Sequence, residues 1–233
     1  MIDSAATSLD AIALFAPLVA AERDELARQC HWRRCAAQEQ IIDRTDLNHD
    51  VYFLIEGMVR IVDYSFSGRE VSFDDLSAGT YFGHLAAVDG KPRSASVVAL
   101  TATQVASMSP TLFLQVVSRH HDLALDVMQN MAEMVRRSTD RIMDLSTLGA
   151  NNRVHAEILR LARANLTDDN SANITPIPVH SDIASRVSTT RETVARVFSD
   201  LARAGLVERR ANKMVVSDFA MLELLVEDVR GGD

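Results

Sequence analysis

Side chains able to recognise another molecule gather near the C-terminus, between residues 188 and 199. Helical spacing places one group of them together on a single face, namely Arg191, Glu192, Ala195, Arg196 and Ser199. The opposite face is apolar and comprises Val194, Val197, Phe198 and Leu201. Arginine donates paired hydrogen bonds to guanine and glutamate accepts one from cytosine, so the polar face suits contact with base edges in a DNA groove.

The residues on either side of this helix fit a winged helix-turn-helix. Thr190 occupies the expected N-cap, where its hydroxyl can accept a hydrogen bond from a free backbone N–H. Gly205 fits the position just beyond the helix C-terminus. Residues 206–208 and 214–216 predict the two strands of a wing. Basic residues connect these strands and are expected to contact DNA phosphates, with a solvated turn as the alternative: Arg209, Arg210 and Lys213.

The distribution of charge supports a local contact with nucleic acid. The chain of 233 residues has a formal net charge of −8. Residues 151–217 nevertheless carry ten Arg and Lys against seven Asp and Glu, whereas residues 1–149 carry thirteen against twenty. Because the basic excess coincides with the predicted helix-turn-helix, it indicates a DNA-binding module within an acidic chain.

A second group of polar residues, at Gly83 and Arg93, suits an anion. Glycine permits close approach to the backbone, and a short helix after Gly83 would direct free N–H groups and its positive end toward an anion. Arg93 offers a planar fork to a phosphate, and Ser94 adds a hydroxyl. We favour this interpretation over the alternative that Arg93 is an ordinary surface charge.

Hydrophobic patterning predicts the elements that position these groups. Apolar residues around Pro17 predict short helices within residues 9–30. Between about residues 38 and 109, short β-rich segments separated by glycines predict an antiparallel sandwich or roll. These segments are 51–55, 59–62, 71–73, 96–98 and 104–106. Helical periodicity then runs from residue 110 to about residue 148, and Pro110 fits the first turn of this helix. Two further helices are predicted at residues 153–166 and 219–229.

The long helix carries an apolar seam at alternating three- and four-residue steps. Its members are Val127, Met131, Met134, Ser138, Ile142 and Leu145. This spacing is typical of a helix that pairs with a copy of itself, so we expect a homodimer. Gly149 is expected to end the helix. The polar Ser138 within the seam either contacts a ligand or sets the register of the pair.

The order of these elements, together with two motifs, resembles the CRP/FNR superfamily of bacterial transcription regulators. The motifs are Arg191-Glu-x-x-x-Arg196 and Pro92-Arg-Ser-Ala95, and the similarity covers nearly all of residues 9–217. The resemblance implies an α+β fold whose four parts are a cyclic-nucleotide-binding β-roll with N-terminal helices (1–109), a long dimerisation helix (110–149), a winged helix-turn-helix DNA-binding domain (150–217) and a C-terminal acidic helix (218–233).

The resemblance also implies a ligand site. Arg93 would pair with the phosphate of cAMP or cGMP and Ser94 would hydrogen-bond it, while Gly83 and Leu85 would line the pocket with backbone. The family has a glutamate after the glycine for the ribose 2′-hydroxyl, and this chain has His84. A neutral imidazole replaces a charge-assisted hydrogen bond by an uncharged one, so we expect roughly tenfold weaker binding.

Further partners follow from the same resemblance. Ser138 and Thr139 match the positions that contact the base of the nucleotide, and their hydroxyls suit adenine or guanine. The expected operator is a palindrome with TGTGA-like half-sites. In each half-site Arg191 and Arg196 would bond guanine and Glu192 would bond cytosine. Thr190 would hold a phosphate. The expected partners are double-stranded DNA, a second copy of the chain and RNA polymerase, with the nucleotide as allosteric ligand and no cofactor.

The sequence also allows alternative interpretations. The regulator could act without ligand if His84 marks a degenerate pocket, or His84 could bind haem and sense a gas. Cys30 and Cys35 lack metal-ligand spacing and are expected to be buried thiols, so no metal site is expected. We find no pairing of nucleophile and base, which argues against an enzyme. Without a long apolar run or a signal-peptide pattern, a cytoplasmic location and no membrane partner are expected.

Overall fold

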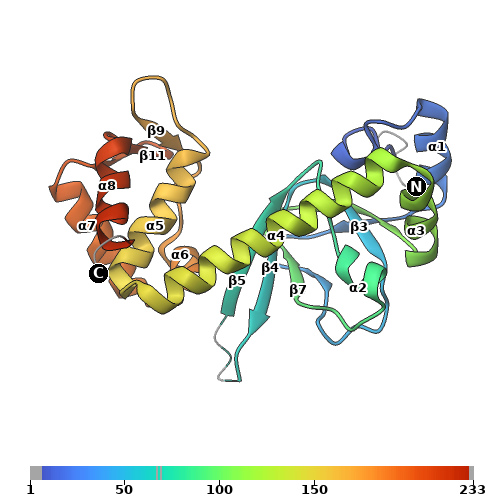
Figure 1. The fold of residues 1–233 in the computed structure, drawn as a ribbon, viewed down its shortest axis with the longest axis horizontal. Helices are drawn as coiled ribbons and strands as arrows, with labels where there is room; N and C mark the ends of the chain where they lie inside the picture. Colours follow the sequence, from blue (N-terminus) through green and yellow to red (C-terminus); the bar gives the residue numbers. More distant parts are fainter. Residues whose placement is uncertain (1–6, 67, 69, 231–233) are drawn as a thin grey trace. The chain divides into compact units, whose positions relative to one another are not determined.

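The computed structural model describes residues 7–66, 68 and 70–230. Backbone contacts divide the chain into two compact units, Met1–Met134 and Val135–Asp233 (Figure 1). In the described part of the chain, no helix has both the length and the apolar character needed to cross a lipid bilayer.

The first unit contains two antiparallel sheets, each with four strands within the described residues. One sheet has the order β1 (His31–Cys35), β8 (Thr103–Met108), β3 (Val51–Glu56) and β6 (Tyr81–Phe82). The other has the order β2 (Gln40–Ile42), β7 (Ser96–Ala99), β4 (Met58–Tyr64) and β5 (Glu70–Ser77). The five β-rich segments identified in the sequence are confirmed as strands β3, β4, β5, β7 and β8.

Strand β3 explains how the sheets build two cores. Successive side chains of a strand point to opposite faces. Val51 and Phe53 therefore pack with the helices of this unit, where the ring of Phe53 lies 4.8 Å from that of Phe15. Tyr52 and Leu54 instead join a cluster that draws side chains from both sheets. Cys30 and Cys35 are both buried free thiols, as predicted.

Helices cover the outer face of the sheet that contains β3. They are the 3-10 turn Ala13–Phe15, α1 (Ala20–Arg28), α2 (His84–Asp89), α3 (Pro110–Arg119) and the start of α4 (His121–Thr147). The prediction of one helix from residue 110 to 148 is wrong, because His120 has an extended backbone (φ −118°, ψ 106°) that separates α3 from α4. This break allows Phe113 of α3 and Leu123 of α4 to enter the same core.

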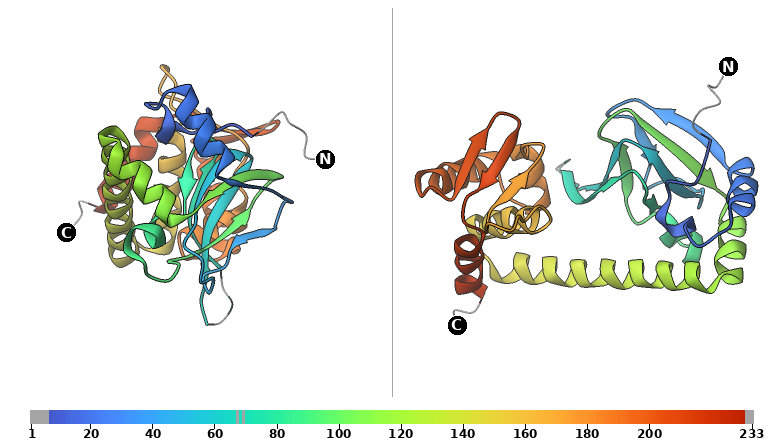
Figure 2. Two further views of the ribbon diagram at one scale, coloured as in Figure 1. Left: turned by 90° about the vertical axis from the view of Figure 1, so that its right-hand side faces the viewer. Right: turned by 90° about the horizontal axis from the view of Figure 1, so that it is seen from above.

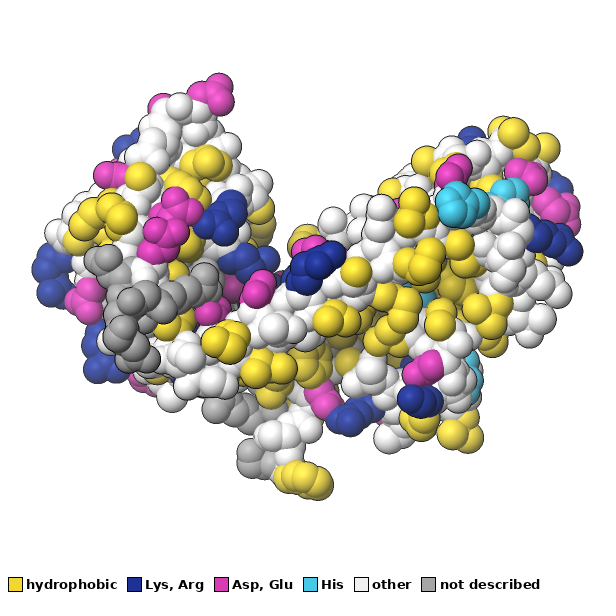
Figure 3. Space-filling model, viewed as in Figure 1, with side chains coloured by type: hydrophobic (Ala, Val, Ile, Leu, Met, Phe, Trp, Pro, Cys, Tyr) yellow, Lys and Arg dark blue, Asp and Glu magenta, His cyan; other side chains and the backbone are white. Residues whose placement is uncertain are grey.

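Helix α4 is uninterrupted over its 27 residues (Figure 2). The predicted seam is wrong at Val127, which is 5% exposed and packs in the core of the first unit. The adjacent Met128 is 57% exposed, and at seven-residue steps from it Val135 and Ile142 are 65% and 62% exposed. Exposed hydrophobic side chains over α4 are visible in Figure 3. We call Met128, Val135 and Ile142 the α4 stripe.

The second unit surrounds its own apolar core. It contains α5 (Ala150–Arg163), α6 (His180–Arg186), α7 (Arg191–Arg203), α8 (Phe219–Arg230) and a sheet with the order β10 (Val207–Arg210), β11 (Lys213–Val216), β9 (Ala172–Ile174). Gly149 does not close α4, which ends at Thr147, but is the N-cap of α5. The predicted C-terminal helix is confirmed as α8, which buries Leu222 and Val226 in this core.

Candidate functional site

The guanidinium of Arg93 is held inside the first unit by three oxygen atoms. Its Nη1 donates to the carbonyl of Gly83 (2.9 Å), and its Nη2 donates to the carbonyl of Asp50 (2.9 Å) and to Oδ1 of Asn48 (2.6 Å). Arg93 is only 4% exposed, and the centre of its guanidinium lies 5.8 Å from the centroid of the Tyr52 ring. The alternative of an ordinary surface charge is therefore wrong.

Gly83 is required by this arrangement for two reasons. Its φ of +81° lies in the left-handed region, which side chains disfavour. A Cβ at this position would also lie 2.8 Å from Nη1 of Arg93 and 3.0 Å from the carbonyl oxygen of Asp50. Glycine thus allows the guanidinium to lie directly against the backbone where β6 leads into α2.

Arg93 and His84, the residue that follows Gly83, also carry unpartnered polar atoms. Nε of Arg93 and both ring nitrogens of His84 are buried without a hydrogen-bond partner among the described residues. His84 is 3% exposed, and its ring lies edge-on to that of Tyr81 at 5.0 Å. Burial lowers the pKa of His84 to about 4, so the imidazole is neutral near pH 7. A buried polar group without a partner costs about 1–3 kcal/mol, which a hydrogen-bonding ligand would offset.

The other predicted ligand residues lie in different surroundings. Leu85 is half-buried in the first turn of α2, and Ser94 is exposed. Ser138 and Thr139 are exposed on α4 and belong to the second unit, where the Thr139 hydroxyl donates to the carbonyl of Val135 (3.0 Å). The structure therefore brings Gly83 and Arg93 together, while the ring of His84, the next residue, packs against Tyr81.

Asn48 is a residue that sequence reasoning missed. It lies in the loop between β2 and β3, 45 positions before the arginine that it contacts. No local spacing links the two, and an asparagine in a polar loop is an ordinary turn residue. Only the fold reveals that its side chain orients the guanidinium.

The predicted DNA-contacting face of α7 is exposed. Arg191, Glu192 and Arg196 are all exposed, while the opposite face buries Val194, Val197 and Leu201 to 4% exposure or less. The predicted N-cap is confirmed, because the hydroxyl of Thr190 accepts a hydrogen bond from the backbone N–H of Thr193 (3.2 Å).

The wing is confirmed as the hairpin β10–β11, with Arg210 opposite Lys213. Gly205 has a φ of +74° and, as predicted, follows the end of α7. Two of the wing cations have partners within the chain: Arg210 contacts Glu208 (2.7 Å), and Nζ of Lys213 donates to Oδ1 of Asn173 (2.7 Å). Arg209 is exposed.

His180, at the start of α6, is a second residue that the sequence did not single out. Its ring lies 4.9 Å from that of Phe198 on α7. Partial burial, and then the positive charges of Arg191 and Arg209, lower its pKa. These two arginines belong to α7 and to the wing, so charges on both elements act on the pKa of His180.

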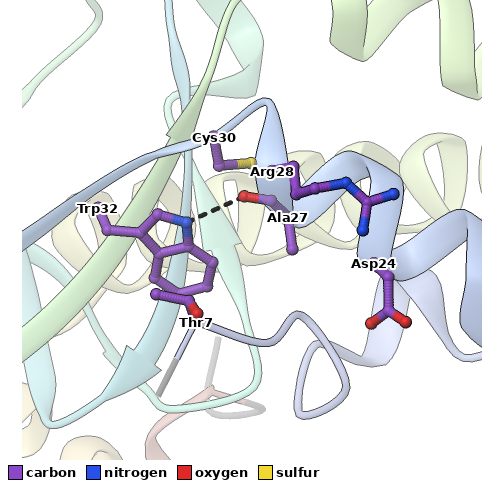
Figure 4. A pocket seen from close by; sticks show the side chains of 6 residues that line it. All are labelled: Thr7, Asp24, Ala27, Arg28, Cys30 and Trp32. Carbon is purple, nitrogen blue, oxygen red and sulfur yellow. Dashed lines mark hydrogen bonds between the residues drawn. The ribbon is translucent and has the colours of Figure 1, made fainter. Parts of the chain in front are cut away.

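Two hollows elsewhere in the first unit include none of the predicted ligand residues. One, of about 400 Å³, is lined by Thr7, Asp24, Ala27, Arg28, Cys30 and Trp32, with the indole N–H of Trp32 bonded to the carbonyl of Ala27 at 3.0 Å (Figure 4). The other, of about 310 Å³, lies between α1 and α3. Across the described residues, no three His, Cys, Asp or Glu side chains are grouped so as to hold a metal ion.

Comparison with known proteins matches two regions of the chain, one in each compact unit. The sequence matches the family model of the cyclic nucleotide-binding domain over residues 32–120 and that of the Crp-like helix-turn-helix domain over residues 152–225. It is 29% identical over 197 residues to the cAMP-activated global transcriptional regulator Vfr of Pseudomonas aeruginosa, covering 83% of this chain and 92% of Vfr.

Solved structures show the same architecture. A CRP-family transcriptional regulator of Thermus thermophilus is 28% identical with a TM-score of 0.65, over 84% of this chain and 96% of that one. The c-di-GMP-responsive global regulator CLP of Xanthomonas campestris shares the fold at 19% identity and a TM-score of 0.68, over 81% of this chain and 94% of that one.

Proposed function

Because the chain belongs to the CRP/FNR superfamily of transcription regulators, we propose that it is a homodimer whose binding to a palindromic operator is controlled by cAMP or cGMP. Like the relatives named above, it is a transcription regulator with a DNA-binding helix-turn-helix, and not an enzyme. In this proposal residues 1–109 bind the nucleotide, 110–149 mediate dimerisation, 150–217 bind DNA, and 218–233 form an accessory acidic helix.

One observation carries the ligand assignment: a buried arginine with an unpartnered Nε donates a hydrogen bond to the carbonyl of Gly83, and the next residue is a buried histidine with two unpartnered nitrogens. In the proposed complex, Arg93 and Ser94 bind the cyclic phosphate, and the backbone of Gly83 and Leu85 lines the pocket. His84 accepts a hydrogen bond from the ribose 2′-hydroxyl. A buried site of this kind strengthens charge-assisted hydrogen bonds, because water does not compete for the donors.

The nucleotide base requires a further contact in this proposal. Ser138 and Thr139 are exposed hydroxyl residues on α4, the helix that also bears the α4 stripe. Each hydroxyl can donate and accept, so either purine is compatible. A base held by α4 would give the ligand a direct effect on the pairing helix.

The exposed face of α7 supports the DNA assignment. Arg191 and Arg196 would bond guanine in the major groove, and Glu192 would accept a hydrogen bond from cytosine in TGTGA-like half-sites. Thr190 would contact a phosphate in addition to capping α7. From the wing, Arg209, Arg210 and Lys213 would contribute phosphate contacts, which add affinity without sequence information.

The α4 stripe supports pairing of two chains. Three apolar side chains, each more than half exposed at heptad spacing, suit a parallel pair of helices. The ligand would then shift the equilibrium toward the arrangement of the pair that binds DNA, through its higher affinity for that arrangement. RNA polymerase is the expected partner of the DNA-bound dimer.

Calorimetry and DNA binding test this proposal together. We expect cAMP or cGMP to release or absorb heat on binding and to raise the affinity for a TGTGA-like palindrome. Arg93→Ala should abolish both effects, whereas Arg33→Ala, which removes an exposed arginine from β1, should preserve them. Heat and DNA response that persist in Arg93→Ala would contradict the pocket assignment.

A ligand-independent regulator is the second candidate, and one observation favours it. Arg93 already has three oxygen partners within the chain, so its charge is partly satisfied without a phosphate. This candidate predicts tight operator binding with no response to either nucleotide. A haem-bound His84 would instead give the purified protein a strong Soret absorbance.

A further inference from the structure

Arg153, on the first turns of α5, binds three backbone carbonyls with one guanidinium. Its Nη1 donates to Leu148 (2.8 Å), its Nε donates to Val187 (2.8 Å), and its Nη2 donates to Ser188 (3.1 Å). Leu148 follows the end of α4, while Val187 and Ser188 form the turn of the helix-turn-helix. A single side chain therefore joins the end of α4 to the turn before the recognition helix.

The carbonyls that Arg153 binds are ones that need an external partner. The last carbonyls of a helix accept no hydrogen bond from the N–H groups of the same helix, and α6 ends at Arg186. The next residue but one, Ser188, has a φ of +52°, a conformation that non-glycine residues rarely adopt. Hydrogen bonds from Arg153 to both turn carbonyls stabilise this strained conformation.

A second arginine reinforces the connection from α4 itself. Nη2 of Arg141 donates to the carbonyl of Arg186 at 2.8 Å. The side chain of Arg186 in turn lies 3.4 Å from the carboxylate of Glu157 on α5, and both are largely buried. The end of α6 is thus attached to α4 and α5 at consecutive carbonyls, and Arg153 supplies the attachment nearest to α7.

We propose that Arg153 is a positioning residue that fixes the direction of α7 relative to the end of α4. This proposal rests on the proposed function, because direction matters only if two copies must match two half-sites. In a dimer, binding of the second half-site is an intramolecular event, which raises the affinity for DNA. A rigid connection between α4 and α7 restricts this gain to correctly spaced half-sites. The planar fork is essential, since an ammonium cannot reach three carbonyls in this arrangement.

The test uses the full chain and two duplexes that differ only in spacing. One carries TGTGA-like half-sites one helical turn apart, and the other has two additional base pairs between them. The variants are Arg153→Met, which has similar length and no donors, and Arg153→Lys, which retains the charge. Arg163→Met is the matched control, because Arg163 lies on the same helix and makes an exposed ion pair with Glu223. The nucleotide that proves effective for the wild type is present throughout.

We expect the wild type to favour the correctly spaced duplex, and Arg153→Met to lose on the order of 10²-fold in affinity for it, with less than about threefold for the longer duplex. Arg153→Lys should give an intermediate ratio of the two affinities, and Arg163→Met should retain the wild-type ratio. Thermal unfolding reports any loss of folding separately.

Two outcomes would overturn the proposal. Equal losses on both duplexes for Arg153→Met and Arg153→Lys would show that the arginine only stabilises the fold of the second unit. Affinities equal to those of the wild type on both duplexes in both variants would show that it does not position α7 at all. A wild-type protein that binds neither duplex would refute the DNA part of the proposed function before any variant is compared.

Discussion

Nη1 of Arg93 donates to the carbonyl oxygen of Gly83 at 2.9 Å, and the same nitrogen occupies the space that a Cβ at residue 83 would need. We therefore expect Gly83→Ala to displace the guanidinium as well as to strain the backbone, at about 1–3 kcal/mol of stability. Denaturant unfolding measures the stability, and calorimetry measures the loss of nucleotide binding.

Gly90→Ala is the matched control for this substitution. Gly90 also has a positive φ, of +67°, but a Cβ there would meet no atom within 4 Å. The Gly90→Ala variant should lose a similar amount of stability to Gly83→Ala, but it should keep the nucleotide affinity of the wild type. If both variants bind nucleotide like the wild type, the close contact between Arg93 and the backbone is not required.

Removal of the Asn48 side chain tests whether Arg93 needs to be oriented. Asn48→Ala deletes the 2.6 Å hydrogen bond to Nη2 but leaves the two carbonyl partners in place. Loss of one hydrogen bond to a charged group should weaken nucleotide binding by roughly ten- to a hundredfold. Calorimetry on Asn48→Ala and Asn48→Asp checks this. An affinity equal to that of the wild type in both would exclude an orienting role.

The neutral state of His84 predicts how stability depends on pH. Burial lowers its pKa from 6.5 to about 4, so between these values the unfolded chain binds a proton that the folded chain does not. The unfolding free energy therefore falls as the pH falls through this window. From pH 7 to pH 5, His84 alone should account for a loss of about 2 kcal/mol.

Comparison of the wild type with His84→Leu isolates this effect. Leucine removes the titration and the two unpartnered nitrogens while retaining much of the volume. The variant should be more stable at pH 5, with a flatter pH profile in urea unfolding, and should bind nucleotide more weakly. Parallel profiles for the two proteins would contradict the low pKa of His84.

Substitution of Arg196 tests the face of α7. We expect Arg196→Ala to cost about 1–3 kcal/mol in operator binding and to relax discrimination at one base pair. Arg203→Ala is the control, because Arg203 lies in the last turn of the same helix and pairs with Asp200. Fluorescence anisotropy with single-base variants of the operator measures both. Wild-type discrimination in Arg196→Ala would remove this residue from the interface.

A charge in the α4 stripe should prevent pairing. Ile142 is 62% exposed, and Ile142→Asp would place a carboxylate where two apolar surfaces are expected to meet. Light scattering after gel filtration should report a single subunit for this variant and a dimer for the wild type. Met143→Asp, at the neighbouring 55% exposed position off the stripe, should stay dimeric. A dimeric Ile142→Asp protein would locate the interface elsewhere.

Periodic patterns made most of the fold predictable. Five strands of the roll and the two faces of α7 depend on residues close in sequence, so their spacing was sufficient. Strand β1 was missed because His31-Trp-Arg-Arg-Cys35 shows no apolar alternation, and it is defined by its pairing with β8 instead. The break at His120 was missed because neither glycine nor proline marks it, and only the shared core explains it.

The candidate site was predictable where a motif is contiguous. Gly83, His84 and Arg93 lie within eleven positions, and a hydrogen bond joins Arg93 to the carbonyl of Gly83. Asn48 and the turn contacts of Arg153 join residues more than 30 positions apart, and neither an asparagine nor an arginine has a spacing that announces its partner. Long-range polar contacts of this kind depend on the whole fold.

The shared use of α4 limits how the protein can be divided for experiments. Leu123 and Val127, at the start of this helix, fill the core of the first unit, as does Phe113 of α3. A shortened chain that stops at residue 109 would expose the remainder of that core to water and should aggregate when expressed. One that runs to residue 134 retains every one of these side chains, and is the better starting point for crystals of the isolated N-terminal half.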